Sequence, residues 1–425
     1  MLGLKNSCVL SCGLHGPSLL QGKSMSPTLD RLIRNMLAAG LAVILITASA
    51  VLLAAAKPPG RDYWPTQNWR SAYPETQGMD SSKLLKVMPF IKENLPDIRS
   101  LLVVRHGYIV FENYYAMGAP DRQDTVHSVT KSITSILFGI ARDQGLIGSL
   151  DKTLYDYLPN YFDASAQNDK KSITLKHLLT MTAGLQPIRV TDRRLWLAWR
   201  FAPDRTRFTL DLPMIQPPGK RFAYSNAVSH LLSVVLTKTA GVPLWDFAAR
   251  NLFNPLGIRP RLWKTDAQGF NSGGSGLYLC ARDMAKIGYL YLNQGQWNGK
   301  QIVSAQWVAE STRRQVSAAR DYGYGYQWWT RDVAGCPAYL AWGLNGQFIV
   351  VVPRMDLVIV VTSRTSMPRK PSGHYVPLFD IVAEAVLDEA CNSHLREEKN
   401  TGGNKNSPPE LQNFSAVLPG RLKEK

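Results

Sequence analysis

Runs of apolar residues with strand character lie towards both ends of the patterned part of the chain. Towards the N-terminus, "IRSLLVVRHGYIVFENYY" (98–115) holds two β-rich runs on either side of His106-Gly107, which predicts a β-hairpin. Towards the C-terminus, four further strand-like runs follow one another across short turns: "YGYGYQWWT" (322–330), "AYLAWG" (338–343), "QFIVVVP" (347–353) and "LVIVVTS" (357–363).

The centre, from about 128 to 315, has the apolar spacing of helices interrupted by Pro and Gly. Three of these segments close on a glycine, as helix C-termini often do: "SITLKHLLTMTAG" (172–184), "SNAVSHLLSVVLTKTAG" (225–241) and "ARDMAKIGYLYLNQG" (281–295). A helix is also predicted on each side of the β-rich regions: "SSKLLKVMPFIKENL" (81–95), with its serines as the cap, and "VPLFDIVAEAVLDEA" (376–390).

This order of elements predicts an α+β fold over residues 78–391. The simplest packing lets the strands from both ends of this range join one antiparallel sheet, because each β-rich region must bury an apolar face. The first and last helices then flank the sheet, and the central region forms an inserted, mostly helical lobe. The crevice between the two parts is the default position for a functional site.

The N-terminal region contains a long apolar segment. Residues 36–56, "MLAAGLAVILITASAVLLAAA", carry no charge and, at about 1.5 Å per residue, can cross a hydrocarbon core of ~30 Å. Arg31 and Arg34 precede the segment, which keeps the N-terminus in the cytoplasm and exports the downstream part, as in a periplasmic enzyme. We predict a polar leader (1–35) followed by a transmembrane anchor or a cleaved signal peptide, with the unbroken length favouring the anchor.

Two other segments lack globular patterning. Residues 57–77 are rich in Pro, Tyr and Trp and are predicted to form an extended linker. Residues 392–425 contain few apolar side chains and are predicted to form a disordered tail. The folded domain is therefore expected between these two segments.

Composition fits a globular protein, with 45% hydrophobic and 19% charged residues. The net charge of +17 can accompany nucleic-acid or anionic-membrane binding. The basic residues are scattered in pairs such as Arg193-Arg194 without a nucleic-acid-binding motif, so we predict no nucleic-acid partner. The cysteines, at positions 8, 12, 280, 336 and 391, show no metal-ligand spacing, so we predict no metal site, and we expect no cofactor. A disulfide among the last three stays an alternative, but their odd number and wide spacing favour no structural disulfide.

The stretch "HSVTKSITS" (127–135) places Lys131 three residues after Ser128, at the start of a largely apolar helix. Residues three apart share a helix face, so the amine can reach the serine oxygen. Burial lowers the pKa of a lysine and supplies a neutral amine as a base. The helix N-terminus also brings N–H groups close to a developing oxyanion. The pair predicts a nucleophile with its own base, and the alternative is a capping serine beside a solvated lysine.

Two later motifs add to this hypothesis. Tyr224-Ser225-Asn226, in "PPGKRFAYSN", stands directly before a predicted helix, where a phenol and an amide can project into a crevice. Gly343 and Gly346, in "AWGLNGQFIVVVP", stand at the edge of a strand, where small residues let a substrate backbone approach. The sequence contains neither a G-x-S-x-G elbow nor an H-E-x-x-H zinc helix, which excludes two common classes of hydrolase.

With these motifs the chain resembles the serine β-lactamase-like family of penicillin-recognising hydrolases, in particular its class C-like esterase and amidase branch with the 6-aminohexanoate-dimer hydrolases. The pairing of S-x-x-K with Tyr-x-Asn is typical of that branch. The likeness runs in order from about Gly78 to Ala390 and includes "ITLKHLLTMTAGL" and "LFNPLGI". It implies a β-lactamase/transpeptidase-like fold and hydrolysis of a small-molecule ester or amide.

The resemblance also implies a role for each matching residue. Ser128 would be the nucleophile that forms an acyl-enzyme. Lys131 and Tyr224 would share the proton transfers, one taking the serine proton and the tyrosine serving the leaving group. Asn226 would orient Lys131 and the carbonyl-bearing group of the substrate.

The third motif departs from the family pattern. The backbone N–H groups of Ser128 and of Gln347, which follows Gly346, would still form the oxyanion hole. Where the family often has Lys or His, however, this chain has Leu344-Asn345, so the cation that recognises a substrate carboxylate is missing. Esters or linear amides without that carboxylate are the expected substrates. Two alternatives stay open: a β-lactamase or D,D-peptidase, and a non-catalytic sensor that traps an acyl group.

Several aromatic and histidine residues near the expected crevice have a structural interpretation. His127 adjoins the nucleophile but is predicted to point away from the Ser-Lys face, and His177 and His230 are interpreted as hydrogen-bonded polar residues on helices. Five tryptophans are expected mainly in the core, with one or two lining an apolar acyl pocket: Trp196, Trp199, Trp328, Trp329 and Trp342.

Overall fold

The computed structural model describes four stretches of the chain: 60–162, 168–319, 321–364 and 372–387. The predicted leader, apolar segment (36–56) and tail (392–425) lie outside these stretches, and those interpretations stay predictions. Within the described stretches, no single helix has the length and apolar composition to span a membrane; the bent pair Asn226–Ala240 and Leu244–Leu256 passes that test only when its parts are taken together.

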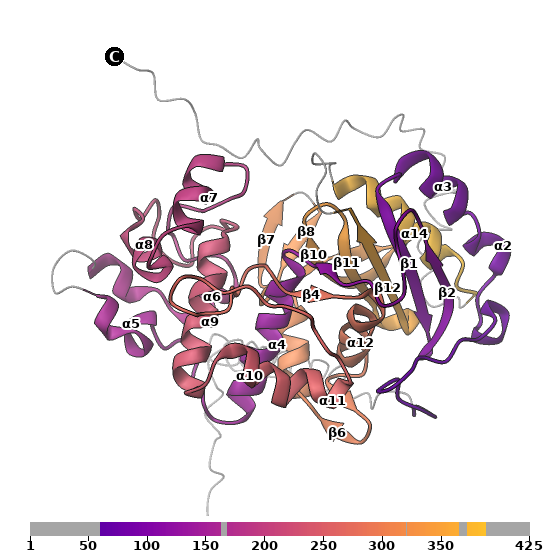
Figure 1. Ribbon diagram of the computed structural model, residues 1–425, viewed down its shortest axis with the longest axis horizontal. Helices are drawn as coiled ribbons and strands as arrows, with labels where there is room; N and C mark the ends of the chain where they lie inside the picture. The colour runs from indigo at the N-terminus through magenta and orange to yellow at the C-terminus, as the bar shows by residue number, and fades with distance from the viewer. Residues whose placement is uncertain (1–59, 163–167, 320, 365–371, 388–425) are drawn as a thin grey trace, which may run out of the picture. The chain divides into compact units, whose positions relative to one another are not determined.

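In the described part of the chain, an eight-stranded antiparallel sheet has the order β2-β1-β12-β11-β10-β9-β8-β7 (Figure 1). Its strands are β1 (Ile98–Arg105), β2 (Tyr108–Tyr114), β7 (Val316–Ala319), β8 (Tyr322–Tyr324), β9 (Trp329–Val333), β10 (Cys336–Gly343), β11 (Gln347–Val352) and β12 (Leu357–Ser363). β1 pairs with β12, with Leu101 opposite Val361. The N-terminal hairpin and the C-terminal meander therefore form one sheet, as predicted.

Short strand pairs and helices complete the structure. The other strands are β3 (Asp124–Thr125) with β4 (Tyr278–Leu279), and β5 (Gln296–Trp297) with β6 (Lys300–Gln301). The helices are α2 (Ser81–Leu84), α3 (Val87–Asn94), α4 (Val129–Asp143), α5 (Leu154–Tyr157), α6 (Leu175–Leu179), α7 (Arg193–Arg200), α8 (Arg205–Asp211), α9 (Asn226–Ala240), α10 (Leu244–Ala248), α11 (Asn254–Leu256), α12 (Ala281–Leu292), α13 (Ala305–Thr312) and α14 (Val376–Glu384).

The helix predicted over 81–95 is divided into α2 and α3. Its cap is Asp80 rather than a serine: the Asp80 carboxylate accepts hydrogen bonds from the backbone N–H groups of Ser82 and Lys83. An aspartate one residue earlier competes well for this position, because its charged oxygen satisfies the free N–H groups of the first turn.

Helices cover both faces of the sheet, which explains why β11 and β12 are buried at every position. Phe348 packs edge to face against Phe379 of α14, with ring centres 5.2 Å apart. The next residue, Ile349, points the opposite way, because side chains alternate along a strand. A Cβ placed on Gly288 of α12 would lie 2.8 Å from Ile349 Cγ2 and 2.6 Å from Val358 Cγ1. The glycine therefore lets α12 pack closely on the face away from α14.

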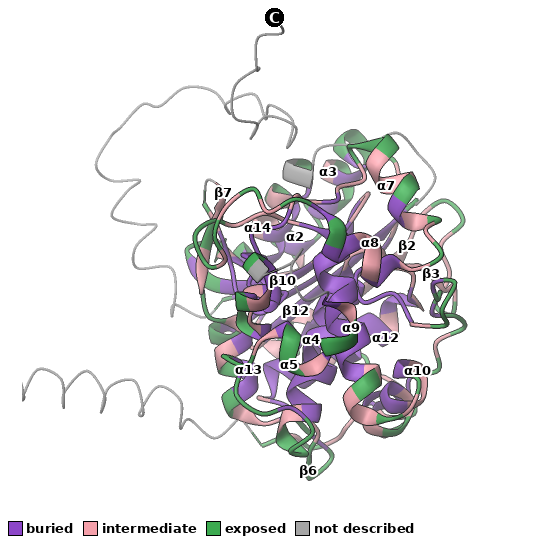
Figure 2. Cartoon of the chain, turned by 90° about the vertical axis from the view of Figure 1, so that its left-hand side faces the viewer, coloured by how far each residue is buried: buried purple, intermediate pink, exposed green. Residues whose placement is uncertain are grey.

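The remaining helices form the predicted second lobe, with α5 to α9 on one side of α4 and the sheet on the other (Figure 1). α4 packs against both α9 and β10. Residues 129–141 of α4 and 226–236 of α9 are buried without interruption, and both helices lie in the interior in Figure 2. The N-terminal ends of α4 and α9, which carry the predicted site residues, thus meet inside the protein.

The described part of the predicted linker is held against the domain. The Arg61 guanidinium donates two hydrogen bonds to the Asp356 carboxylate, both 2.6 Å long. The Ala72 N–H donates to the Ile109 carbonyl at 3.0 Å, next to β2. Residues 60–77 therefore lie against the folded domain rather than crossing open solvent.

The cysteine prediction was wrong in one respect. Cys336, at the start of β10, is disulfide-bonded, whereas Cys280 is a buried free thiol. Wide spacing along the chain does not exclude a disulfide, because the fold decides which distant segments bring two Cβ atoms within bonding reach.

Candidate active site

Ser128 is the N-cap residue of α4, and its side chain makes no capping hydrogen bond. The residue before it, His127, has a φ of +46°, so the chain turns sharply into the helix. The first turn closes through backbone bonds from Val129 to Val126 and from Lys131 to Ser128. The Ser128 hydroxyl is consequently not used by the helix end.

Lys131 is buried, with 1% of its surface exposed. Its Nζ donates to three neutral acceptors: Ser128 Oγ at 3.1 Å, Asn226 Oδ1 at 2.7 Å and the Gly274 carbonyl at 2.7 Å. Burial without a carboxylate partner lowers the pKa of Lys131 to about 7. The alternative of a capping serine and a solvated lysine therefore does not describe this pair.

Tyr224 completes the group around the serine. The Ser128 side chain lies close enough to the Tyr224 phenol to affect its pKa, and Lys131 Nζ lies 4.9 Å from the centre of the Tyr224 ring. Burial is the main influence on the phenol and raises its pKa well above the usual value. The phenol is thus protonated at neutral pH, while the neighbouring amine is close to half neutral.

An extended segment of the helical lobe holds the Tyr-Ser-Asn motif in place. The Ile188 N–H donates to Ser225 Oγ at 3.1 Å, and the Asn226 N–H donates to the Ile188 carbonyl at 3.1 Å. Ser225 is the N-cap residue of α9, but its hydroxyl serves this contact instead of capping the helix. These bonds orient Asn226 so that its amide oxygen accepts from Lys131.

The Gly273-Gly274 pair, which no motif singled out, lies against α9 and Lys131. A Cβ on Gly273 would stand 2.1 Å from the Ser229 carbonyl, and one on Gly274 would stand 3.2 Å from Lys131 Nζ. Because neither residue has a side chain, the backbone can come close enough for the Gly274 carbonyl to accept a hydrogen bond from Lys131 Nζ. The signal in the sequence was the run of small residues "NSGGSG" (271–276) between two apolar segments.

The third motif lies at the turn between β10 and β11, where Gly343 pairs with Gln347. A Cβ on Gly343 would lie 2.3 Å from the Val126 carbonyl, so this turn packs against the segment that enters α4. A Cβ on Gly346, which has a φ of +89°, would lie 2.2 Å from the Tyr375 hydroxyl. Both glycines are therefore required by close packing within the chain. The sequence had instead suggested that they make room for a substrate.

A family model described as Beta-lactamase matches residues 99–376, about two thirds of the chain. The chain belongs to the Beta-lactamase family. Members of this family are serine hydrolases, and the match extends from β1 to the start of α14. The resemblance stated from the motifs is therefore confirmed at the level of the family.

Two curated relatives of this Beta-lactamase family chain carry hydrolase names. The 6-aminohexanoate-dimer hydrolase of Paenarthrobacter ureafaciens is 25% identical over 296 residues, which cover 65% of this chain and 74% of the relative. The esterase EstB of Burkholderia gladioli is 30% identical over 182 residues, which cover 37% of this chain and 45% of the esterase.

Solved structures confirm the fold of the Beta-lactamase family chain. EstCE1, a hydrolase with promiscuous acyltransferase activity, aligns with a TM-score of 0.60 at 20% identity, covering 71% of this chain and 98% of EstCE1. An octameric penicillin-binding protein homologue from Pyrococcus abyssi aligns with a TM-score of 0.59 at 18% identity, covering 75% and 81%. At these identities the likeness shows the fold alone.

Among the described residues of this Beta-lactamase family chain, His127, His177 and His230 do not supply a base at the Ser128 site. Burial is the main cause that lowers the pKa of His127 to about 4, so its ring is neutral and a weak base. His177 forms a reciprocal capping box with Thr174. His230 Nε2 lies 2.9 Å from Asp266 Oδ2 in the interior, with both side chains fully buried.

Two of the five predicted tryptophans form an aromatic wall beside the phenol. Trp329 stacks on Tyr224 with ring centres 5.6 Å apart. The ring centre of Trp342 lies 5.1 Å from that of Trp329. The other three pack against the apolar clusters of the structure: Trp196, Trp199 and Trp328.

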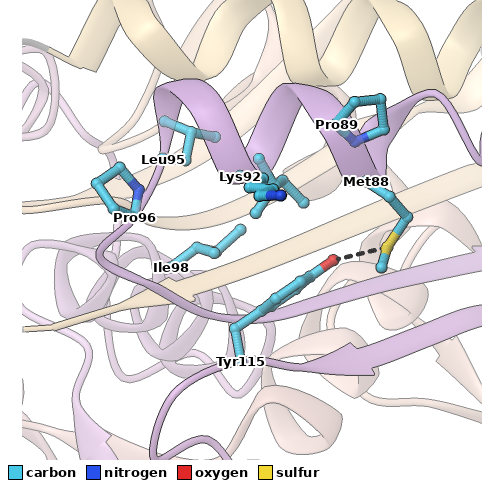
Figure 3. A pocket seen from close by; sticks show the side chains of 8 residues that line it. Met88, Pro89, Lys92, Leu95, Pro96, Ile98 and Tyr115 are labelled. Carbon is cyan, nitrogen blue, oxygen red and sulfur yellow. Dashed lines mark hydrogen bonds between the residues drawn. The ribbon is translucent and has the colours of Figure 1, made fainter.

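An apolar groove of about 390 Å³ beside α3 is separate from this site. Figure 3 shows Met88, Leu95, Ile98 and Tyr115 among the side chains that line it. None of its lining residues belongs to α4, α9 or the β10–β11 turn. Among the residues that the structure describes, no group of three or more His, Cys, Asp or Glu side chains could hold a metal ion.

Proposed function

We propose that this chain is a serine hydrolase that cleaves an ester or amide bond of a small molecule through an acyl-enzyme on Ser128. One observation carries the proposal: Lys131 Nζ lies 3.1 Å from Ser128 Oγ, and the Tyr224 phenol lies close enough to the same side chain for the serine to affect its pKa. A nucleophile with a base on one side and a protonated donor on the other is the arrangement that acyl transfer requires.

The two proton carriers take different tasks in this proposal. The neutral amine of Lys131 accepts the hydroxyl proton as Ser128 Oγ attacks the substrate carbonyl. The phenol of Tyr224 then donates its proton to the departing oxygen or nitrogen, and the acyl group stays on Oγ. Water then attacks this ester: the proton it loses restores the phenol of Tyr224, and the Lys131 ammonium returns its proton to Ser128 Oγ as the acid leaves. The low pKa of Lys131 and the high pKa of Tyr224 support this division.

The oxyanion would be held by the backbone N–H groups of Ser128 and Gln347. In support, Ser128 begins α4, where first-turn N–H groups and the helix dipole favour negative charge. Gln347 begins β11 at the turn whose Gly343 packs against Val126. Each such donor is worth roughly 10²–10³ in rate in acyl-transfer enzymes.

The proposal predicts a characteristic pH dependence. Only the neutral form of Lys131 can accept the serine proton, and its pKa is lowered to about 7. We therefore expect kcat/KM for a p-nitrophenyl ester to rise from pH 5 and level off above about pH 8, with an apparent pKa near 7. A profile that is flat or falls between pH 6 and 8 would remove Lys131 as the base.

The acyl-enzyme itself is tested by mass spectrometry and steady-state kinetics together. Mixing the protein with p-nitrophenyl acetate and quenching early is expected to give an acetyl group on the peptide containing Ser128, with continued release of nitrophenolate. An adduct that never turns over would instead support the acyl-trapping sensor. Hydrolysis of nitrocefin faster than of simple esters would support a β-lactamase.

A further inference from the structure

Arg189 differs from most of the buried and half-buried arginines in the described stretches. Its side chain is half-buried, its Nε is shielded from solvent, and its guanidinium has no hydrogen-bond or ion-pair partner in the described stretches. Burying a cation without a partner is costly, so enclosed arginines are normally paired. Other enclosed arginines do have partners: Arg61 with Asp356, Arg99 with Asp124, and Arg205 with the Arg200 carbonyl.

The position of Arg189 connects it to the Ser128 site. Its chain neighbour Ile188 is fully buried and makes both backbone contacts that hold Ser225 and Asn226. Asn226 in turn accepts from Lys131. Arg189 therefore follows directly after the residue that holds the Tyr-Ser-Asn motif in place. Through Ile188 and Asn226, Arg189 is thus connected by backbone and side-chain contacts to the residues around Ser128.

No carboxylate of the protein neutralises this region within the described residues. The acid nearest in sequence, Asp192, is exposed. Its carboxylate caps α7 by accepting a hydrogen bond from the Leu195 N–H at 3.1 Å. Burial alone lowers the pKa of Arg189. Beyond burial, the pKa of His127 is lowered by the charges of Lys131 and Lys264. The surroundings of the site are thus positive.

We propose that Arg189 binds a carboxylate of the substrate, so that the ester or amide cleaved at Ser128 carries a negative charge near the scissile bond. This inference rests on the proposed function. A guanidinium matches a carboxylate with two parallel hydrogen bonds, and the incoming anion would supply the missing partner of the enclosed cation. Arg189 would then replace the cation absent from Leu344-Asn345, which reverses the expectation of a carboxylate-free substrate.

Matched esters test the proposal. One pair places the charge on the acyl side: the mono-p-nitrophenyl ester of glutaric acid against p-nitrophenyl valerate. The other places it on the leaving group: 4-acetoxybenzoate against its methyl ester. For each pair, the ratio of kcat/KM for the charged ester to that for the neutral one is measured in wild type, Arg189→Gln and Arg189→Lys. Arg193→Gln, which removes an exposed charge four residues away, is the matched control.

In wild type, one of the two ratios is expected to exceed unity. Arg189→Gln should lower that ratio about tenfold or more, mainly through KM, because a charge-assisted hydrogen-bond pair is lost. Arg189→Lys should retain part of the preference, and Arg193→Gln should leave the ratio at its wild-type value. Equal ratios in wild type and Arg189→Gln for both pairs would overturn the inference.

A second measurement separates this inference from the proposed function. If neither the charged nor the neutral esters are hydrolysed, the serine hydrolase is refuted, whereas hydrolysis without a charge preference would refute only the role of Arg189. Glutarate is also expected to slow fluorophosphonate labelling of Ser128 in wild type, and to do so less in Arg189→Gln. Equal protection in both proteins would contradict carboxylate binding by Arg189 without requiring any ester to turn over.

Discussion

Replacing Ser128 with alanine is expected to abolish covalent labelling by a fluorophosphonate and to lower kcat for p-nitrophenyl acetate by about 10⁴-fold or more. The hydroxyl is the atom that bonds to the substrate carbon in the proposed mechanism, and neither Lys131 nor Tyr224 can take its place. Gel fluorescence measures the labelling, and nitrophenolate absorbance measures the turnover.

Ser135→Ala is the matched control for this variant. Ser135 lies on the same helix two turns later, is fully buried, and its Oγ has no hydrogen-bond partner in the part of the chain that the structure describes. Removing that hydroxyl should leave labelling and kcat within about twofold of wild type, since no bond is lost. Equal labelling of wild type and Ser128→Ala would end the proposal for this residue. Melting temperatures within a few degrees exclude unfolding as the cause.

Lys131→Met is expected to lower kcat/KM by about 10³-fold, in the range found when a general base is removed. Methionine approximates the length of the lysine but cannot accept a proton. The rise of kcat/KM with an apparent pKa near 7 should disappear as well, because the titrating amine is gone. The measurement is a pH–rate profile of the variant with the same p-nitrophenyl ester.

Lys286→Met separates the loss of a base from the loss of a buried amine. Lys286 is also buried, and its Nζ donates to two carbonyls, those of Thr66 at 3.1 Å and Gly257 at 2.9 Å. Lys131 donates to two comparable oxygens besides Ser128. Both variants leave buried acceptors unpaired and should change the melting temperature, but only Lys131→Met should lose catalysis. Similar losses of kcat/KM in both would indicate a structural effect.

Most of the fold could be predicted from periodicity. β11 and β12 are buried on both faces, and their continuous runs of valine and isoleucine predict this burial from the sequence. The division of the 81–95 helix was not readable, because Asp80 and the serines are all acceptable caps and only packing selects among them. The disulfide of Cys336 was missed because it depends on which distant segments the fold brings together.

The candidate site was only partly readable. Ser128 and Lys131 lie three apart on one helix, so their contact follows from helix geometry alone. Asn226 was inferred from the family resemblance, and the structure brings it to Lys131 from another helix. The Gly274 carbonyl left only the run of small residues "NSGGSG" (271–276) as a signal. The unpaired Arg189 left none, because a missing salt-bridge partner has no sequence motif.

The sequence by itself determined the elements, the two-lobed α+β arrangement and the local pairing of the serine with its lysine, since these depend on neighbours within a turn of helix or along a strand. The tertiary structure alone decided that Lys131 is enclosed by neutral acceptors and so has a pKa of about 7, and that Arg189 lacks a counter-charge. Both properties depend on the dielectric and on partners that come from segments far apart in the chain, which no local pattern encodes.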